Sequence, residues 1–381
     1  NRKWSCCGVR IGLRTLAHSG LQDLIVNDRL MGVKMTKKIG ILRGREDNFP
    51  NALVEAINHK GKGEVVAEMA IMGAGRLGEK PVYDLIYDRI SHDYPYYRYL
   101  LKAAVARGTY VIPNPLLWSA DDKYLGFTLA ADLGLTIPKT CLLPIAGSTQ
   151  LYDITAESLR NLKYLDQPEW QAIFGYIGFP CWLKPVSGGG WLAVSKVHNP
   201  DEFFHLYNNE IFHTRPVYPE DAGQDMVVRN WLSRTLVFML QEDIAYQQFA
   251  RCFYIAGDVT TVRFEPPVRV AGERLGRYSV DPDFFGPELL ARIEAYVRKL
   301  NQALGYEINT TELLVKDGVP YAIDFLNFAC DFDINSVGVH LADMGVDKVS
   351  DYLISCVTDE SARLQSNDNV WRNLIHGGLN R

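Results

Sequence analysis

Two carboxylates interrupt apolar, strand-like runs in the C-terminal third of the chain. Glu312 lies within the run 309–315 and Asp324 within the run 320–327. An unpaired carboxylate on a buried surface is costly, whereas Mg²⁺ bound to phosphate prefers hard oxygen ligands of this kind. The pair therefore indicates a magnesium site, and two solvent-exposed charges on edge strands are the alternative.

The turn between the two runs decides whether these carboxylates can meet. A three-residue loop, Lys316-Asp317-Gly318, with Gly318 in the left-handed conformation would place Glu312 and Asp324 on one face of a hairpin. A two-residue Asp-Gly loop would place them on opposite faces. We predict the three-residue loop.

A glycine-rich loop with a preceding lysine is the second feature that could do chemistry. Lys184 ends an apolar run, and Ser187 and three glycines follow it. Such glycines weaken a strand without adding to a core, but they let backbone N–H groups approach phosphate oxygens closely. The lysine would add a positive charge. A hairpin tip with a solvated lysine is the alternative.

Two other nucleotide-binding motifs are disfavoured. Residues 73–78 satisfy G-x-G-x-x-G, but Pro81 and a β-rich run follow in place of the helix that the dinucleotide fingerprint requires. We therefore predict a surface loop there. No G-x-x-x-x-G-K-[ST] motif occurs in the sequence.

Hydrophobic periodicity predicts the elements that position these residues. An α/β lobe over 36–118 is expected to alternate helices with parallel strands, and Lys123 is expected near the start of a helix over 119–133. The expected helices are 49–57, 97–106, 119–133, 170–176, 200–208 and 287–304; the expected strands are 38–42, 64–67, 83–88, 109–112, 181–185, 192–196 and 235–241, followed by hairpins that turn at 256–258 and 316–318.

Composition places the chain among ordinary globular proteins of more than one lobe. It has 381 residues, of which 47% are hydrophobic and 22% charged. Its formal charge of −5 gives no sign of the excess positive charge that nucleic-acid binding requires. Seven cysteines, mostly in apolar runs, favour reduced thiols. No apolar run reaches the ~18 residues that span a bilayer, and no signal-peptide core is found. We therefore expect a cytoplasmic protein without membrane or nucleic-acid partners.

The order of the motifs resembles that of ATP-grasp enzymes. Lys123 at a helix start, the runs 137–140 and 178–184, the glycine loop, the run 240–242, and then Glu312, Asp324 and Asn327 follow one another as in that superfamily. Over residues 115–340 the chain is similar to the branch of glutathione synthetases, D-alanine:D-alanine ligases and ribosomal-protein glutamate ligases.

The resemblance implies an α/β architecture, an ATP-grasp fold preceded by a small Rossmann-like domain. The implied division is a pre-ATP-grasp domain at 36–118, a core at 119–137 and 241–365, a lid at 138–240 and a tail at 366–381. Residues 1–35 show little periodicity before the strand-like run that follows Met35, and we expect them to be a non-structural extension.

The resemblance also implies roles for individual residues. ATP would be bound by Lys123, Lys184, Ser187, Gly188, Gly189, Gly190, Gln241, Glu242, Asp243 and Ile244, and Mg²⁺ by Glu312, Asp324 and Asn327. Arg251 and Arg263 would contact the γ-phosphate or the substrate carboxylate, with structural salt bridges as the alternative. The chain departs from the family at 246–249, which lacks the usual acid for the ribose, and at Asn327, which needs a β-bulge to reach the metal. Asp331 and Asp333 lie just beyond Asn327 and are the alternative metal ligands.

The implied activity is that of an ATP-dependent carboxylate–amine ligase. It would use Mg²⁺, with Mn²⁺ as an alternative, and form an acyl phosphate from a small-molecule acid before coupling it to an amine. Three alternatives stay open: phosphate transfer or bicarbonate activation without amide formation, modification of a protein terminus, and a nucleotide-binding module that lacks ligase activity. A homodimer also stays open.

Overall fold

The computed structural model describes residues 36–77, 82–116, 122–144, 160–163, 165–187, 194–207, 237–270, 273–281 and 283–364. The predicted extension at 1–35 and the tail at 366–381 lie outside these residues. The described elements belong to one compact unit that begins at Lys37.

A parallel sheet opens this unit. Its strands are β1 (Lys37–Leu42), β2 (Val65–Met69), β3 (Leu85–Asp88) and β4 (Tyr110–Ile112), in the order β2-β1-β3-β4. Two helices lie between them in sequence, α2 (Asn48–Gly61) and α3 (Pro95–Ala106). Buried side chains of α2 pack on one face of the sheet and those of α3 on the other, as a parallel sheet requires. The alternation of helices with parallel strands that was predicted for this region is confirmed.

The connection from β2 to β3 contains neither helix nor strand in its described residues. This confirms the surface loop predicted at the G-x-G-x-x-G motif as far as Leu77, which is fully exposed. Gly78 lies outside the described residues.

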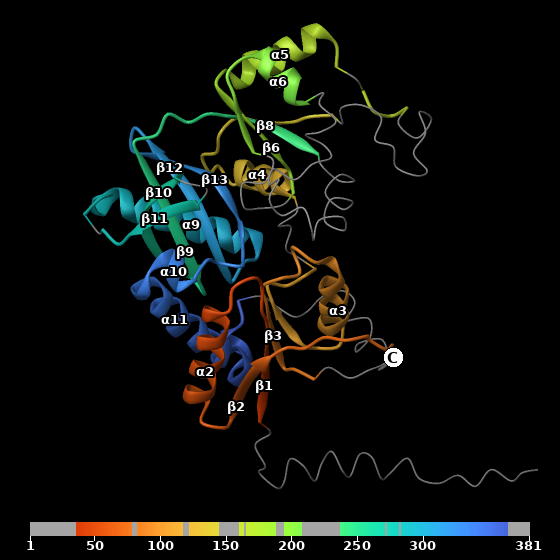
Figure 1. The fold of residues 1–381 in the computed structure, drawn as a ribbon, viewed down its shortest axis with the longest axis vertical. Helices are drawn as coiled ribbons and strands as arrows, with labels where there is room; N and C mark the ends of the chain where they lie inside the picture. Colours follow the sequence, from red (N-terminus) through yellow and green to blue (C-terminus); the bar gives the residue numbers. More distant parts are fainter. Residues whose placement is uncertain are drawn as a thin grey trace, which may run out of the picture. The chain divides into compact units, whose positions relative to one another are not determined.

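The central sheet is antiparallel and carries the two runs with Glu312 and Asp324. Its order is β11-β10-β9-β12-β13, with bounds β9 (Gln248–Ile255), β10 (Asp258–Val270), β11 (Glu273–Ser279), β12 (Ile308–Lys316) and β13 (Val319–Asn327). Helices α4 (Lys123–Asp132) and α9 (Pro287–Leu304) share a hydrophobic core with one face of this sheet. Figure 1 shows these elements.

The third sheet is also antiparallel, with the order β5-β8-β6-β7. Its strands are β5 (Thr140–Leu142), β6 (Cys181–Pro185), β7 (Ser195–Val197) and β8 (Phe238–Glu242), and its helices are α5 (Gln167–Ile177) and α6 (Pro200–Tyr207). An aromatic core joins helices to strands, with Trp170 packed against Phe174 and Phe203. Most elements predicted in this region are thus confirmed, with small shifts at their ends.

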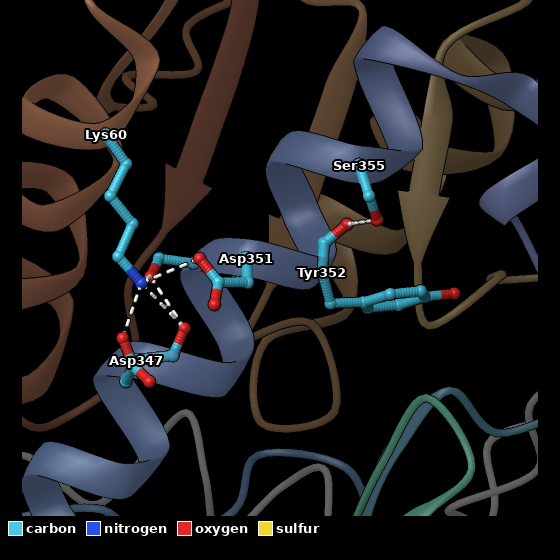
Figure 2. A network of polar contacts seen from close by, with 6 residues as sticks. Lys60, Asp347, Asp351, Tyr352 and Ser355 are labelled. Atoms are coloured by element: carbon cyan, nitrogen blue, oxygen red, sulfur yellow. Dashed lines mark hydrogen bonds and ion pairs between the residues drawn. The ribbon is translucent and has the colours of Figure 1, made fainter.

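The C-terminal helices were not predicted from the sequence. They are α10 (Ile334–Val337), α11 (Val339–Thr358) and the short 3₁₀ helix η2 (Glu360–Ala362). Helix α11 packs along α2. Figure 2 shows a polar link between the two helices, in which Lys60 of α2 reaches Asp347 and Asp351 of α11. Lys60 Nζ donates to Asp347 Oδ1 at 2.6 Å, Asp351 Oδ1 at 2.7 Å and Ser350 Oγ at 2.9 Å. The core of the parallel sheet therefore continues through α11 into the central sheet.

Two further expectations concern the cysteines and the possibility of membrane-spanning helices. All cysteines in the described part of the chain are free thiols, as predicted: Cys141, Cys181, Cys252, Cys330 and Cys356. Among the helices of the same residues, none combines the length and the apolar composition that crossing a membrane requires.

Candidate active site

The β12–β13 turn differs from the prediction. Lys316 pairs with Val319, so the loop has two residues, and both Asp317 (φ 51°) and Gly318 (φ 72°) lie in the left-handed region. The three-residue loop was therefore wrong. The physical reason is that Asp-Gly is strongly favoured in a type I′ turn, whose twist matches that of the flanking strands.

Two β-bulges nevertheless bring the predicted oxygen ligands together. The register shifts between Leu313 and Glu312, so that Glu312 pairs with Asp324 and not with Ile323. It shifts again before Thr310, which pairs with Asn327. The second shift is the bulge that the sequence required for Asn327. Side chains of directly paired residues lie on the same face, so Glu312, Asp324 and Asn327 share one face of the sheet.

Both predicted lysines reach this face from other elements. Lys123 opens α4, which Asp122 caps through the Leu125 amide, and its Nζ lies 3.2 Å from Asp324 Oδ2. Lys184 near the end of β6 donates from Nζ to the Ile323 carbonyl at 3.2 Å. Residues separated by about 200 positions are thus assembled at one place, which we call the charged cluster: Lys123, Lys184, Arg251, Glu312 and Asp324.

Lys184 has an unusual electrostatic environment. Burial and the nearby ammonium of Lys123 lower the pKa of Lys184 to about 7, although Asp324 and Glu312 act in the opposite direction. Its Nζ also lies 5.4 Å from the ring centroid of Phe127, on α4. A lysine with a pKa lowered in this way is only partly protonated near neutral pH, and a bound anion would favour its charged form.

Arg251 completes the cluster. It pairs with Glu312 across β9 and β12, and Nη1 donates to Glu312 Oε1 at 2.5 Å. Burial opposes the charge of Arg251, but Glu312 raises the pKa above its ordinary value. Arg251 Nε has no hydrogen-bond partner in the described chain, so the guanidinium keeps a donor for a further anion.

The pKa values of the two carboxylates in the cluster are shifted in opposite directions. Burial and the neighbouring Asp324 raise the pKa of Glu312, and Arg251 only partly offsets this. Burial also opposes ionisation of Asp324, but Lys123 and Lys184 lower its pKa below the ordinary value. Two carboxylates held this close repel each other, and a bound cation would reduce that repulsion.

The donor set fits Mg²⁺ when phosphate completes it. Mg²⁺ is usually held by one or two carboxylates with several waters and phosphate oxygens, and this face offers two carboxylates and the Asn327 amide, whose side chain has no partner among the described residues. No group of three or more His, Cys, Asp and Glu side chains in the same residues could hold a metal alone. Asp331 and Asp333, the substitutes that the sequence offered, bind Ser336 and cap α10 respectively.

Arg263 is not brought to the cluster. It pairs with Ala250, the residue before Arg251, and neighbouring residues of a strand point to opposite faces. Arg263 instead donates to Glu265 Oε1 at 2.8 Å and lies 4.5 Å from the ring centroid of Phe284. Of the two predicted arginines, only Arg251 adjoins the carboxylates.

The segment 241–244, which was predicted to bind ATP, comprises the last two residues of β8 and the two that follow. Its side chains are engaged: Gln241 Nε2 donates to Thr140 Oγ1 at 2.9 Å, and Glu242 Oε2 accepts from the Lys139 amide at 3.1 Å. Asp243 accepts from Trp182 Nε1 at 2.6 Å. Ile244 is buried, yet its backbone N–H finds no acceptor within the described residues. The backbone after β8 is therefore what could bind a ligand here.

The glycine loop lies mostly outside the described residues. Ser187, just beyond β6, is half-buried, whereas Gly188, Gly189 and Gly190 are not described. The base of the loop is fixed, because the Lys123 amide donates to the Val186 carbonyl at 3.0 Å. This bond ties the start of α4, and with it Lys123, to the strand that carries Lys184.

Sequence reasoning missed Tyr278, which lies beside Arg251. The Arg251 Cζ atom is 5.7 Å from the Tyr278 ring centroid, and the Tyr278 hydroxyl donates to Asp331 Oδ2 at 3.4 Å. Burial raises the pKa of Tyr278, so the hydroxyl stays protonated. Only the pairing of β10 with β11 reveals this neighbour, and no local pattern in the sequence predicts that pairing.

Several solved structures resemble this one. The D-alanine–D-alanine ligase from Bacillus anthracis is 16% identical, with 86% of this chain and 98% of that chain covered and a TM-score of 0.55. VanG D-Ala:D-Ser ligase from Enterococcus faecalis is 12% identical, with 85% and 100% covered and a TM-score of 0.55. The ATP-grasp ligase PsnB, complexed with a minimal precursor, is 15% identical, with 84% and 99% covered and a TM-score of 0.53.

These likenesses extend over most of the chain and show that it has the ATP-grasp fold. No protein-family model and no curated protein matches the sequence. The Bacillus anthracis ligase has also been solved with ATP, and PsnB with Mg and ADP.

Proposed function

We propose that this chain, whose fold is that of ATP-grasp ligases, is an ATP-dependent ligase that joins a carboxylate to an amine. The observation that carries the proposal is the charged cluster. Two lysines from α4 and β6 meet two carboxylates of the β12–β13 hairpin, on a face that fits Mg²⁺ only together with phosphate. ATP and Mg in the similar structures support this choice.

Lys123 and Lys184 would bind the phosphates of ATP. Their ammonium groups are held by Asp324 and by the Ile323 carbonyl, so their positions are set before the nucleotide arrives. Glu312, Asp324 and Asn327 would hold Mg²⁺, which when bound would neutralise phosphate charge. We infer that the backbone after β8 binds adenine and that the loop 187–190 covers the phosphates.

Arg251 would orient the substrate carboxylate against the γ-phosphate, since a guanidinium can bind both anions at once. An oxygen of the carboxylate attacks the γ-phosphorus, and the bond to ADP breaks. The amine nitrogen then attacks the acyl carbon, the bond to phosphate breaks and the amine loses a proton. No enzyme nucleophile is required. We propose that residues 138–240 act as a lid that excludes water from the acyl phosphate.

Trapping with hydroxylamine tests this function without knowledge of the amine. Hydroxylamine converts an acyl phosphate into a hydroxamate, so the protein is incubated with ATP, Mg²⁺, hydroxylamine and a panel of amino acids and short peptides. We expect one class of acid to give hydroxamate and ADP in equal amounts. ATP binding without either product across the panel would contradict ligase activity and favour a nucleotide-binding module.

The cluster is tested in the same assay. Lys184→Ala and Asp324→Ala are each expected to lower hydroxamate formation by about 10²-fold or more, because each removes charge stabilisation at the reacting phosphate. Lys102→Ala, at an exposed position of α3, is the matched control and should retain the wild-type rate. Circular dichroism checks that each variant is folded. Wild-type rates in either cluster variant would refute this site.

A further inference from the structure

The segment after β13 presents one carboxylate on a fixed backbone. Cys330 and Phe332 are fully buried in the core that joins the parallel sheet to α11. Arg89 Nη2 donates to the Cys330 carbonyl at 2.8 Å, and the Phe332 ring stacks on Phe253 with centroids 5.1 Å apart. Asp331, between these two anchors, is half-buried. Its position is therefore set by the core and not by a mobile loop.

The partners of Asp331 are neutral donors. Oδ2 accepts from the Ser336 hydroxyl and, at 3.4 Å, from the Tyr278 hydroxyl, and Oδ1 accepts from the Asp333 amide at 3.1 Å. In the part of the chain that the structure describes, Asp331 forms no ion pair. An ionised carboxylate has about four acceptor positions, so these bonds orient Asp331 and still leave it able to bind a cation.

Asp331 is linked to Arg251 through Tyr278, which contacts both residues. The Arg251 guanidinium binds Glu312 at 2.5 Å, lies over the Tyr278 ring and is influenced electrostatically by Asp331. An acid activated at Arg251 would thus lie close to Asp331. The amine has to reach the acyl carbon of that acid from above or below the plane of its carboxyl group, so its binding site must adjoin Arg251.

We infer that Asp331 binds the amine substrate in its cationic form, as a primary ammonium group, and that Tyr278 and Ser336 hold the carboxylate in place for it. The inference rests on the proposed function and names the class of its second substrate. Asp331 is a binding residue in this account, and it takes no part in forming the acyl phosphate.

Two nucleophiles that differ in charge separate the formation of the acyl phosphate from the binding of the amine. Hydroxylamine is largely uncharged at neutral pH, whereas amino-acid amides carry an ammonium group and no carboxylate. With an acid that the wild type converts to a hydroxamate, Asp331→Asn should leave the hydroxamate rate within about twofold. It should raise KM for the best of twenty amino-acid amides by about tenfold or more, the effect of losing a hydrogen bond to a charged group.

Asp333→Asn is the matched control. Asp333 lies two residues away and caps α10 through the Asn335 amide at 2.8 Å, and asparagine caps a helix equally well. This variant should retain the wild-type KM for the amide.

Three results would overturn the inference. They are an unchanged KM in Asp331→Asn, an equal loss of hydroxamate and amide products, which would indicate a structural role, and a wild type that couples hydroxylamine but none of the amides. A wild type that forms no hydroxamate fails one step earlier and refutes the proposed ligase function itself.

Discussion

Lys184 is half-buried beside the ammonium of Lys123, and its pKa of about 7 has a consequence for nucleotide binding. Below pH 7 the group carries its charge and attracts phosphate, and above pH 7 it becomes neutral in the free protein. Since one pH unit above the pKa leaves about a tenth of the groups charged, ADP affinity should fall about tenfold between pH 6 and pH 8.

Calorimetric titration of ADP at pH 6, 7 and 8 checks this. Lys184→Met should bind ADP more weakly at pH 6 and show a flatter profile, which separates Lys184 from the titration of ADP itself. Equal pH profiles in the two proteins would show that Lys184 does not govern the dependence.

Single residues of the site were predictable where their chemistry conflicts with their surroundings. Glu312 and Asp324 stand out because carboxylates are costly in apolar strands. Arg263 shows the limit of that reasoning: it is a plausible anion ligand by type, but its face is set by pairing with Ala250. Tyr278 has no local pattern at all, because only the tertiary fold makes it a neighbour of Arg251.

At the scale of elements, local periodicity predicted most helices and strands but not the hairpin register. The strand at 181–185 and the helix at 287–304 match the structure residue for residue. The β12–β13 turn was wrong, and two bulges compensate for its length. Bulges depend on cross-strand packing and on the ligands that they position, so they leave little trace in hydrophobic alternation.

The two-residue turn makes a prediction about stability. Gly318 has φ 72°, so Gly318→Ala should lower the free energy of unfolding by about 1–2 kcal/mol, the cost of a left-handed conformation for a residue with a Cβ atom. Gly175→Ala is the control, since Gly175 lies in α5 with no atom within 4 Å of an added Cβ. It should stabilise by about 0.5–1 kcal/mol. Urea denaturation of both variants measures the contrast, and equal effects would refute the type I′ assignment.

At the scale of the whole molecule, α11 joins parts of the chain that the sequence suggested only as separate lobes. Its side chains complete one core with the parallel sheet and with Phe253 and Ile255 of the central sheet. Lys60 links it to α2. Sequence reasoning could not foresee this arrangement, because the amphipathic pattern of a helix tells which face is buried and not which partner buries it.

Gly345 marks a close approach within this shared core. A Cβ atom at Gly345 would lie 2.5 Å from Phe332 Cδ1 and 2.7 Å from Cγ, so α11 and the segment with Asp331 cannot both keep their places if a methyl group is added. Gly345→Ala should therefore lower the free energy of unfolding by about 1–3 kcal/mol, the usual cost of overpacking, despite the better helix propensity of alanine.

A double-mutant cycle identifies the cause. Phe332→Leu leaves room for the methyl group, so Gly345→Ala combined with Phe332→Leu should be less destabilised than the sum of the two single variants, by about 0.5 kcal/mol or more. Chemical denaturation of the four proteins gives the coupling energy. Additive effects would mean that Gly345 does not set the distance between α11 and Phe332. A clear coupling would show that the helix closing the N-terminal lobe also fixes the backbone that presents Asp331.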